Sequence, residues 1–515
     1  MHHAGGIPDL LFDIAMIIHP TIDDVRAIGY YLGKIIMGLG LVMLVPLGAG
    51  FLFGEINPLF DFLIAVEITF IFGLILTKLC FTDKDLDWMQ GMVVVALSWI
   101  VAMILGAIPL YLSGHWGSYL DACFDAMSGF ATTGLVLVQD LDHLSFTHNF
   151  WRHFIMFIGG QGIVIIALSF FVRGVSGALK MYVGEAREER VLPNVVHTAR
   201  FIWLVSVVYL VLGTVVLGGV GIINGMKPLR AFFHGACVFM AAFDTGGFAP
   251  QSQNILYYHS FPFEIITMMF MFLGAINFKL HYNLWTGNRR EIRRNIEMIT
   301  FFISAMIIFA IVAVGLERGG LYPGPLMLFR KGFYQLISAH TGTGYMTIYA
   351  AQFAREWPDL ALVGVICAMA LGGSSCSTTG GIKMLRIGII FKALQQEIKK
   401  IMLPQKAVVV QRYHHIKEAF LEDKQVRFAL LITLAYLVLY GAGAIVGMLY
   451  GHPFLRALFE STSAAANVGL SCGITNAGMP AVLKLTYIIQ MWAGRLEFIA
   501  VFTLLGFFIA AIRGK

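Results

Sequence analysis

Apolar stretches of about 20 residues recur along the whole chain, from Leu32 to Ala511, with little polar sequence between them. A helix crosses the hydrocarbon core of a bilayer with roughly 20 such residues, because each residue adds about 1.5 Å. Charged side chains account for only 13% of the 515 residues, against about 25% in soluble domains. The sequence therefore excludes an ordinary soluble enzyme and predicts an all-α polytopic membrane protein.

Hydrophobicity predicts ten spans. They lie near residues 34–54, 60–80, 89–113, 150–172, 201–223, 261–285, 298–316, 358–394, 428–450 and 482–512. The span near 358–394 is too long for one plain crossing and contains the polar, glycine-rich run 372–381, which predicts a broken helix. Irregular backbone persists at membrane depth only where it is buried in protein or lines a wet cavity.

The ten spans divide the basic residues unevenly between the two sides of the membrane. One side holds 26 of the 36 lysines and arginines, in segments 1–34, 74–88, 173–200, 279–294, 383–427 and 513–515. Cytoplasmic loops carry such an excess, so both termini are predicted to lie in the cytoplasm. Residues 1–33 lack a basic n-region and a small-residue cleavage site, so no cleaved signal peptide is expected.

Four apolar segments are too short to span, and each leads into a polar turn that contains glycine. They are residues 119–130, 229–243, 326–339 and 454–465, and their turns contain Gly134, Gly246, Gly344 and Gly469. Aligned on these glycines, three of the four segments have serine six residues earlier (Ser128, Ser338, Ser463) and an aromatic ring ten residues earlier (Phe124, Tyr334, Phe459). The shared order of span, half-helix, turn and span predicts a repeated unit.

The predicted architecture is two N-terminal helices followed by four pseudo-symmetric repeats of helix, pore helix, filter loop and helix around a central ion pore. The helix pair is assigned to residues 1–85, and the repeats to 86–185, 186–296, 297–400 and 401–515.

The physics of this unit favours cations. A half-helix that ends near the middle of the membrane directs C-terminal carbonyls, with about half a negative charge, at whatever lies beyond it. A glycine turn lets consecutive carbonyl oxygens face one axis. Four such turns would form a ring that replaces the water shell of an alkali cation. Acids in the external loops would attract cations to the mouth; they are Asp121, Asp125, Asp140 and Asp142.

The motifs at these turns resemble those of the Trk/Ktr/HKT potassium transporter superfamily. They are T-T-G, T-G-G-F, T-G-Y and N-V-G-L in the four turns, G-G-x-x-x-S-T-x-G-G-I-K after the third, and G-R-L-E in the last span. The likeness extends from about residue 30 to the end of the chain. The two leading spans resemble the Trk-type membrane subunit of the TrkH/TrkG kind.

The resemblance implies a potassium filter built from three residues of each turn. These are Thr132, Thr133, Gly134, Asp244, Thr245, Gly246, Gly342, Thr343, Gly344, Asn467, Val468 and Gly469. Glycine at the first key position accompanies potassium selectivity in this family, whereas serine there accompanies sodium transport. Asp244 is an unexpected carboxylate in such a turn, and His340 precedes Gly344 by four residues. Either residue lines the path or is an external structural residue.

The resemblance also implies a gate below the filter. The intramembrane loop would contain Gly372, Gly373, Ser377, Thr378, Gly380 and Gly381, followed by Lys383. Arg495 lies in an apolar stretch, where a charge is a functional candidate by default. The family likeness implies that it faces the pore and hinders cations; the alternative is an ion pair with Glu497 or a hydrogen bond to the loop.

Partners follow from what the chain lacks. No nucleophile elbow, H-E-x-x-H, phosphate loop or phosphorylated-aspartate motif occurs, so the protein is not expected to be an enzyme, to hold its own cofactor or to bind nucleic acid. Segment 383–427, with ten basic and four acidic residues, offers a surface for a peripheral subunit or lipid headgroups. Family likeness favours a TrkA-like cytoplasmic nucleotide-binding regulatory subunit that binds ATP/ADP or NAD, and a homodimer in the bacterial inner membrane.

Several alternatives stay open at this level. The transported ion would be K⁺, but an obligatory Na⁺- or H⁺-coupled symporter, or the channel-like subunit of a potassium ATPase complex, fits the same motifs. His414 and His415 either bind a metal or are solvated loop residues. The six cysteines show no ligand spacing and are expected to be packing residues.

Overall fold

The computed structural model describes residues 20–162, 175–185, 195–404 and 409–513. These residues are mostly helical, and they include one antiparallel hairpin, β1 (Arg412–His415) with β2 (Lys417–Phe420). Six of the described helices are long and apolar enough to cross a membrane. They are α2 (Ile22–Val42) continued by α3 (Val45–Phe53), α4 (Ile56–Leu79), α5 (Trp88–Leu112), α10 (Val195–Ile223), α15 (Ile296–Arg318) and α21 (Asp423–Leu449).

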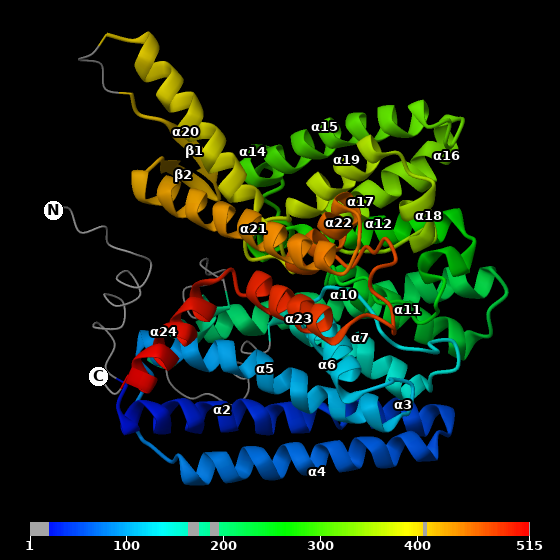
Figure 1. Cartoon of the computed structure of the whole chain (residues 1–515), viewed down its shortest axis with the longest axis vertical. Coiled ribbons are helices and arrows are strands. Elements are labelled where there is room, and N and C mark those ends of the chain that lie inside the picture. The colour runs from blue at the N-terminus through cyan, green and yellow to red at the C-terminus, as the bar shows by residue number, and fades with distance from the viewer. Residues whose placement is uncertain (1–19, 163–174, 186–194, 405–408, 514–515) are drawn as a thin grey trace.

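The N-terminal pair packs α2 along α4 (Figure 1). A Cβ atom on Gly33 would lie 2.9 Å from the Gly73 carbonyl oxygen, so glycine lets the two backbones approach, as is common between membrane helices. The first helix begins at Ile22, well before the predicted residue 34. Thr21 caps it in a capping box with Asp24, and this local signal extends the helix beyond its apolar stretch.

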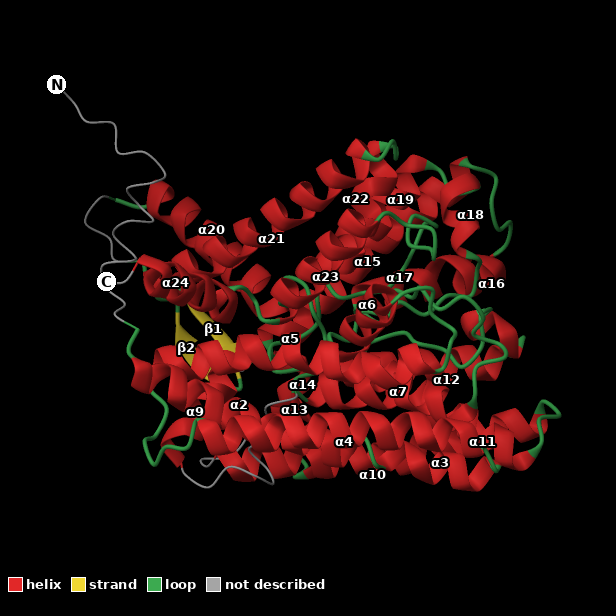
Figure 2. Ribbon diagram, turned by 60° about the horizontal axis from the view of Figure 1, so that its bottom comes forward, coloured by secondary structure: helices red, strands yellow, loops and turns green. Residues whose placement is uncertain are grey.

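The predicted pore helices are confirmed in all four copies. They are α6 (Tyr119–Phe130), α11 (Pro228–Phe243), the continuous run α16 (Pro325–Met327), η2 (Leu328–Phe333) and α17 (Tyr334–His340), and α22 (Phe454–Ala465). Each packs against the long helix that precedes it, namely α5, α10, α15 and α21. Figure 2 shows α6, α17 and α22 inside the molecule, with longer helices around them. The fourfold repeat of helix, pore helix and turn is therefore present.

In the second, third and fourth copies the helix after the turn is interrupted. Helix α12 (Phe261–Ala275) meets α13 (Phe278–Trp285) at 105°, and α23 (Ala481–Arg495) meets α24 (Ile499–Arg513) at 114°. In the third copy, α19 (Asp359–Ala370) and α20 (Met384–Met402) are separated by residues 371–383, as predicted. In the first copy α7 (Phe146–Gln161) ends at Gly162, and the rest of predicted span 150–172 lies outside the described residues.

The spans predicted near 261–285 and 482–512 are therefore each bent at a break that the sequence analysis did not predict. At the first break the Asn277 side chain accepts the Lys279 N–H and starts a new helix. At the second, Glu497 and Phe498 have φ of 49° and 73°, which a helix cannot contain. Hydrophobicity does not reveal either break, because Ile276 and Phe498 keep the stretches apolar.

One end of the molecule, which we call the hairpin end, gathers α20, the β-hairpin, the start of α2 and the end of α24 (Figures 1 and 2). The remaining short elements are α9 (Val175–Gly184), η1 (Asn254–Tyr258), α14 (Arg290–Arg294) and α18 (Ala350–Arg355). Apolar side chains on α4, α10, α15 and α21 are exposed around the outside, which suits helices that face lipid. The charge pattern predicts that the hairpin end faces the cytoplasm.

Candidate functional site

The four turns that follow the pore helices share one backbone conformation. The first residue of each turn has a left-handed φ, and so does the third; we call residues 132–134, 245–247, 342–344 and 467–469 the glycine turns. Their first residues have φ of 52° (Thr132), 50° (Thr245), 69° (Gly342) and 56° (Asn467). Their third residues have φ of 96° (Gly134), 73° (Gly247), 81° (Gly344) and 91° (Gly469). The same backbone geometry in four places shows that one structural unit is repeated.

In the second copy this geometry corrects the predicted register by one residue. Gly246 and Gly247 both donate their N–H groups to the Ala241 carbonyl, at 2.9 and 3.3 Å. Thr343 and Gly344 donate to Ser338 in the same way. Gly247, and not Gly246, is therefore the equivalent of Gly134, Gly344 and Gly469. The motif T-G-G offered two glycines, and only the hydrogen bonding to the pore helix distinguishes them.

Asp244 consequently lies before the glycine turn, at the C-cap of α11, where the other pore helices have Ala131, Thr341 and Ala466. Its carboxylate accepts a hydrogen bond from Gln161 Nε2 at 2.7 Å and packs against Gly160, so it faces the end of α7. His340 is likewise internal. Its Nε2 lies 2.8 Å from Ser304 Oγ, and its ring packs on Phe301 of α15.

The glycine turns form a closed cycle, backbone against backbone. A Cβ atom added to Gly134 would lie within 3.0 Å of the Gly246 carbonyl oxygen, far too close for a real side chain. A Cβ atom added to the third residue of each other turn would likewise meet a carbonyl oxygen of the next turn. The pairs are Gly247 with Thr343, Gly344 with Val468, and Gly469 with Thr133. Each turn thus contacts the next, and the fourth contacts the first. The four turns surround one axis with no space for side chains at these glycines.

The 371–383 loop lies against these turns on the side of the hairpin end. Its two ends pair with each other, since Gly372 N–H donates to Ile382 O at 2.9 Å and Ile382 N–H donates to Ala370 O at 3.1 Å. Thr378 Oγ1 lies 3.1 Å from Thr245 Oγ1 in the second turn. Gly380 packs against the carbonyl of Ala466, beside the fourth turn. The predicted obstruction is therefore in contact with the ring.

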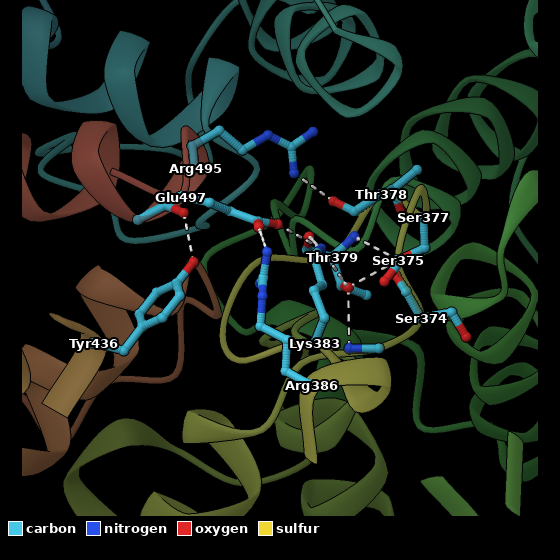
Figure 3. A network of polar contacts seen from close by, with 12 residues as sticks. Ser374, Ser375, Ser377, Thr378, Thr379, Lys383, Arg386, Tyr436, Arg495 and Glu497 are labelled. Atoms are coloured by element: carbon cyan, nitrogen blue, oxygen red, sulfur yellow. Dashed lines mark hydrogen bonds and ion pairs between the residues drawn. The ribbon is translucent and has the colours of Figure 1, made fainter. Parts of the chain in front are cut away.

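Arg495 connects this loop to the first repeat (Figure 3). Its Nη1 donates to Thr378 O at 2.5 Å and to Thr132 Oγ1 at 3.2 Å, while Nη2 donates to Gly159 O at 2.7 Å. The sequence left two alternatives to a charge that faces the pore, namely an ion pair with Glu497 and a hydrogen bond to the loop. The hydrogen bond to the loop is present. The guanidinium also lies at the first residue of a glycine turn, through its hydrogen bond to Thr132.

Glu497 instead pairs with Arg386, the residue that sequence reasoning missed (Figure 3). Lys383 Nζ lies 3.9 Å from Glu497 Oε1 and donates to the carbonyl of Thr379 within its own loop. Glu497 is in the G-R-L-E motif, but nothing in the sequence indicates which of several basic residues in segment 383–427 it meets.

Two cavities flank the ring. One of about 220 Å³ is lined by Gly134, Gly247 and Gly469 and by residues that follow the turns. The other, of about 120 Å³, lies toward the hairpin end and is lined by Lys383, Arg386 and Glu497. The external acids serve other contacts: Asp121 binds Lys484 at 2.5 Å, and Asp142 accepts the Ser252 N–H at 2.8 Å.

The β-hairpin is tied to the end of the second repeat and the start of the third. His414 Nε2 lies 3.0 Å from Glu291 Oε2, and its Nδ1 lies 2.9 Å from Glu418 Oε1. His415 Nδ1 lies 3.8 Å from Glu297 Oε2, and Glu297 Oε1 accepts the Ser375 N–H of the 371–383 loop at 2.6 Å. Across the described residues, no group of three or more His, Cys, Asp or Glu side chains is arranged to hold a metal ion.

Sequence comparison identifies relatives over nearly the whole chain. The sequence model of the TrkH family, described as a cation transport protein, matches residues 59–317 and 327–508. An uncharacterized cation transporter of Methanocaldococcus jannaschii is 31% identical over 94% of this chain and 96% of its own length. The Trk system potassium uptake protein TrkG of Escherichia coli is 27% identical over 94% of this chain and 98% of its own length.

The fold is shared with a solved transporter. The crystal structure of the potassium transporter TrkH from Vibrio parahaemolyticus has a TM-score of 0.78 and 23% identity to this chain. The match covers 93% of this chain and 98% of that one.

Proposed function

This chain belongs to the TrkH family of cation transport proteins, and from that membership we propose that it carries potassium ions across the inner membrane into the cell. The observation that carries the proposal is the closed cycle of glycine turns, in which each turn lies with its backbone against the carbonyl of the next. Carbonyl oxygens of four such turns can replace the water around a potassium ion. The similarity to TrkG, which is named as a potassium uptake protein, supports this ion.

The filter in this proposal consists of the four glycine turns. It keeps Thr132, Thr133, Gly134, Thr245, Gly246, Gly342, Thr343, Gly344, Asn467, Val468 and Gly469, and it adds Gly247. Asp244 is placed outside it, because its carboxylate faces α7. The short pore helices direct their C-terminal partial charge toward the same axis and favour a cation there.

The gate in this proposal is the 371–383 loop held by Arg495. Four hydrogen bonds from the guanidinium bind the loop to the first repeat, below the ring. A fixed positive charge at that point opposes a passing cation. Conduction therefore requires the contact between Arg495 and Thr378 to open.

Regulation belongs to a cytoplasmic partner in this proposal. A TrkA-like nucleotide-binding subunit, with ATP/ADP or NAD, would bind at the hairpin end of a homodimer in membrane lipid, because α20 and the hairpin carry basic residues. Single-channel currents from reconstituted protein would exclude the rival of obligatory coupling to Na⁺ or H⁺. Retention of flux without any ATPase subunit would exclude the role of a channel-like subunit.

Growth of a potassium-uptake-deficient host at limiting potassium, with its regulatory subunit co-expressed, tests the proposal. The wild-type chain should restore growth. Gly134→Ser should abolish the rescue or make it sensitive to sodium, because its side chain would meet the Gly246 carbonyl. The matched control is Gly219→Ser on α10, where an added Cβ has open space. Equal growth with Gly134→Ser and Gly219→Ser would contradict the filter assignment.

A further inference from the structure

In three of the four repeats the segment that leaves the glycine turn, here called a strand, is held from behind by the pore helix of the same repeat. The holding residue lies nine positions before the third residue of the turn, and the held residue lies three positions after it. In chain order the holding positions are Asp125, Val238, Gln335 and Glu460, and the held positions are Leu137, Pro250, Thr347 and Cys472.

Two of the repeats use a buried carboxylate. Asp125 Oδ1 accepts the Leu137 N–H at 2.6 Å, and Asp125 is fully buried. Glu460, equally buried, accepts the Cys472 N–H at 2.9 Å through Oε2 and the Thr475 N–H at 2.8 Å through Oε1. Hydrogen bonds to a charged acceptor are shorter and stronger than neutral ones, so both strands are firmly fixed.

The third repeat joins the same two positions by a neutral contact, in which the pore-helix residue is the donor and a side-chain hydroxyl is the acceptor. Gln335 Nε2 donates to Thr347 Oγ1 at 3.0 Å, and that hydroxyl donates to the Arg330 carbonyl at 2.8 Å. Gln335 is also fully buried. The contact again joins the pore helix to the third residue after the turn.

The second repeat lacks both halves of the contact together. Val238 has no polar side chain, and Pro250 has no N–H to donate. The strand is held there by Tyr345 from the third repeat, whose hydroxyl contacts the carbonyls of Val238 at 2.9 Å and Phe248 at 3.2 Å. Asn149 Nδ2 donates to the Pro250 carbonyl at 2.9 Å. In the first and fourth repeats a carboxylate accepts the N–H of the held residue, whereas the second repeat has neither an acceptor at the pore-helix position nor an N–H to hold.

We propose that Asp125, Gln335 and Glu460 are positioning residues that set ion selectivity by fixing the spacing of the carbonyl ring. None of these three residues forms the ring itself, and each acts through the strand that continues from the ring. A ring held at one diameter discriminates between ions of different size, whereas a loosened ring can contract around the smaller sodium ion. The inference rests on the proposed function, because it assumes that the glycine turns coordinate potassium.

The test measures potassium and sodium uptake side by side in proteoliposomes containing the full chain with its regulatory subunit. Glu460→Gln and Asp125→Asn weaken the contact in their repeats, and Thr347→Val removes it in the third repeat. The ratio of potassium to sodium uptake should fall by roughly three- to tenfold in each, the effect of weakening one hydrogen bond to a buried acceptor. Glu460→Asp keeps the charge on a shorter side chain and should retain part of the wild-type ratio of potassium to sodium uptake.

The matched control is Asp121→Asn. It removes a buried carboxylate from the same helix as Asp125, but its partner is Lys484 and not the strand after the turn. A merely structural role would lower the amount of folded protein in control and test variants alike, without changing the uptake ratio. If one test variant does not fold, the other two decide.

The outcomes separate the two proposals. Failure of the wild-type chain to transport potassium would overturn the proposed function itself. Normal selective uptake by the wild type, with an unchanged ratio in the folded test variants, would overturn only the positioning role. A ratio that falls in the test variants and not in Asp121→Asn supports it.

Discussion

The ring of glycine turns has no room for a methyl group. At Gly344 an added Cβ would overlap the Val468 carbonyl oxygen, and the φ of 81° is strained for any other residue. Gly344→Ala should therefore lower potassium uptake at least tenfold, since overpacking and a left-handed alanine together cost about 2 to 4 kcal/mol. Tracer uptake with surface expression as reference measures this. Gly48→Ala, at a glycine with open space around it, should transport normally; equal uptake by both variants would refute the tight ring.

Arg495 belongs both to the proposed gate and to the hydrogen bonds that join the 371–383 loop to the first repeat. Arg495→Ala removes the positive charge below the ring and the hydrogen bonds to Thr378 and Gly159. Basal flux without the regulatory subunit should rise severalfold, because two obstacles to the ion are lost together. Flux into proteoliposomes measures this. Arg495→Lys keeps the charge with fewer donors and should give an intermediate flux; a lower flux in Arg495→Ala would show that the arginine is needed to hold the path open.

At the level of elements, sequence predicted what depends on local pattern. The pore helices α6, α11, α17 and α22 could be found because a short apolar segment and a glycine turn recur at the same place in each unit. The breaks before α13 and α24 could not, since they are made by the Asn277 cap and by two left-handed residues inside apolar sequence. The register of the second turn was missed because it depends on which N–H groups reach Ala241.

The pairing of Glu497 with Arg386 illustrates the same limit within the site. The two residues are 111 positions apart, and their contact results from the packing of the last bend against α20. Motif resemblance indicated Arg495 and the glycine-rich loop, whose chemistry is local. Tertiary contacts between charged residues on different repeats required the fold.

The β-hairpin is held by a histidine whose charge depends on pH. The hydrogen bond to Glu291, helped by Glu418, raises the pKa of His414 above its usual value. A raised pKa stabilises the folded hairpin below pH 6.5, the value in the unfolded chain, and this stabilisation is lost as the pH rises through the higher folded pKa. Amide exchange in residues 412–420 should therefore become faster, relative to His414→Gln at the same pH, as the pH rises from about 6 to 8.

His259→Gln, outside the hairpin, serves as the control for this effect. Amide exchange in residues 412–420 of this variant should equal that of the wild type at every pH. If the difference in exchange rate between the wild type and His414→Gln stays constant with pH, the charge of His414 does not contribute to the stability of the hairpin.

On the scale of the whole molecule, the 371–383 loop is where all four repeats meet. Thr378 contacts the second turn, Gly380 the fourth, Arg495 joins it to the first, and Glu297 of the third repeat accepts the Ser375 N–H. Glu297 also faces His415 of the hairpin. Glu297 therefore joins the hairpin to the loop. We expect a displacement of the hairpin end to reach the loop through this buried carboxylate.

This arrangement predicts that Glu297 and Arg495 act on the same equilibrium between closed and open loop. Glu297→Gln weakens a charge-assisted hydrogen bond and should raise basal flux about two- to fivefold, less than Arg495→Ala. The double variant should fall short of the product of the two single effects, because either change alone already frees the loop. Flux from the four proteins of this cycle, measured without the regulatory subunit, gives the coupling. Purely multiplicative effects would mean that the two residues hold separate elements, and that the hairpin end has no direct mechanical connection to the gate.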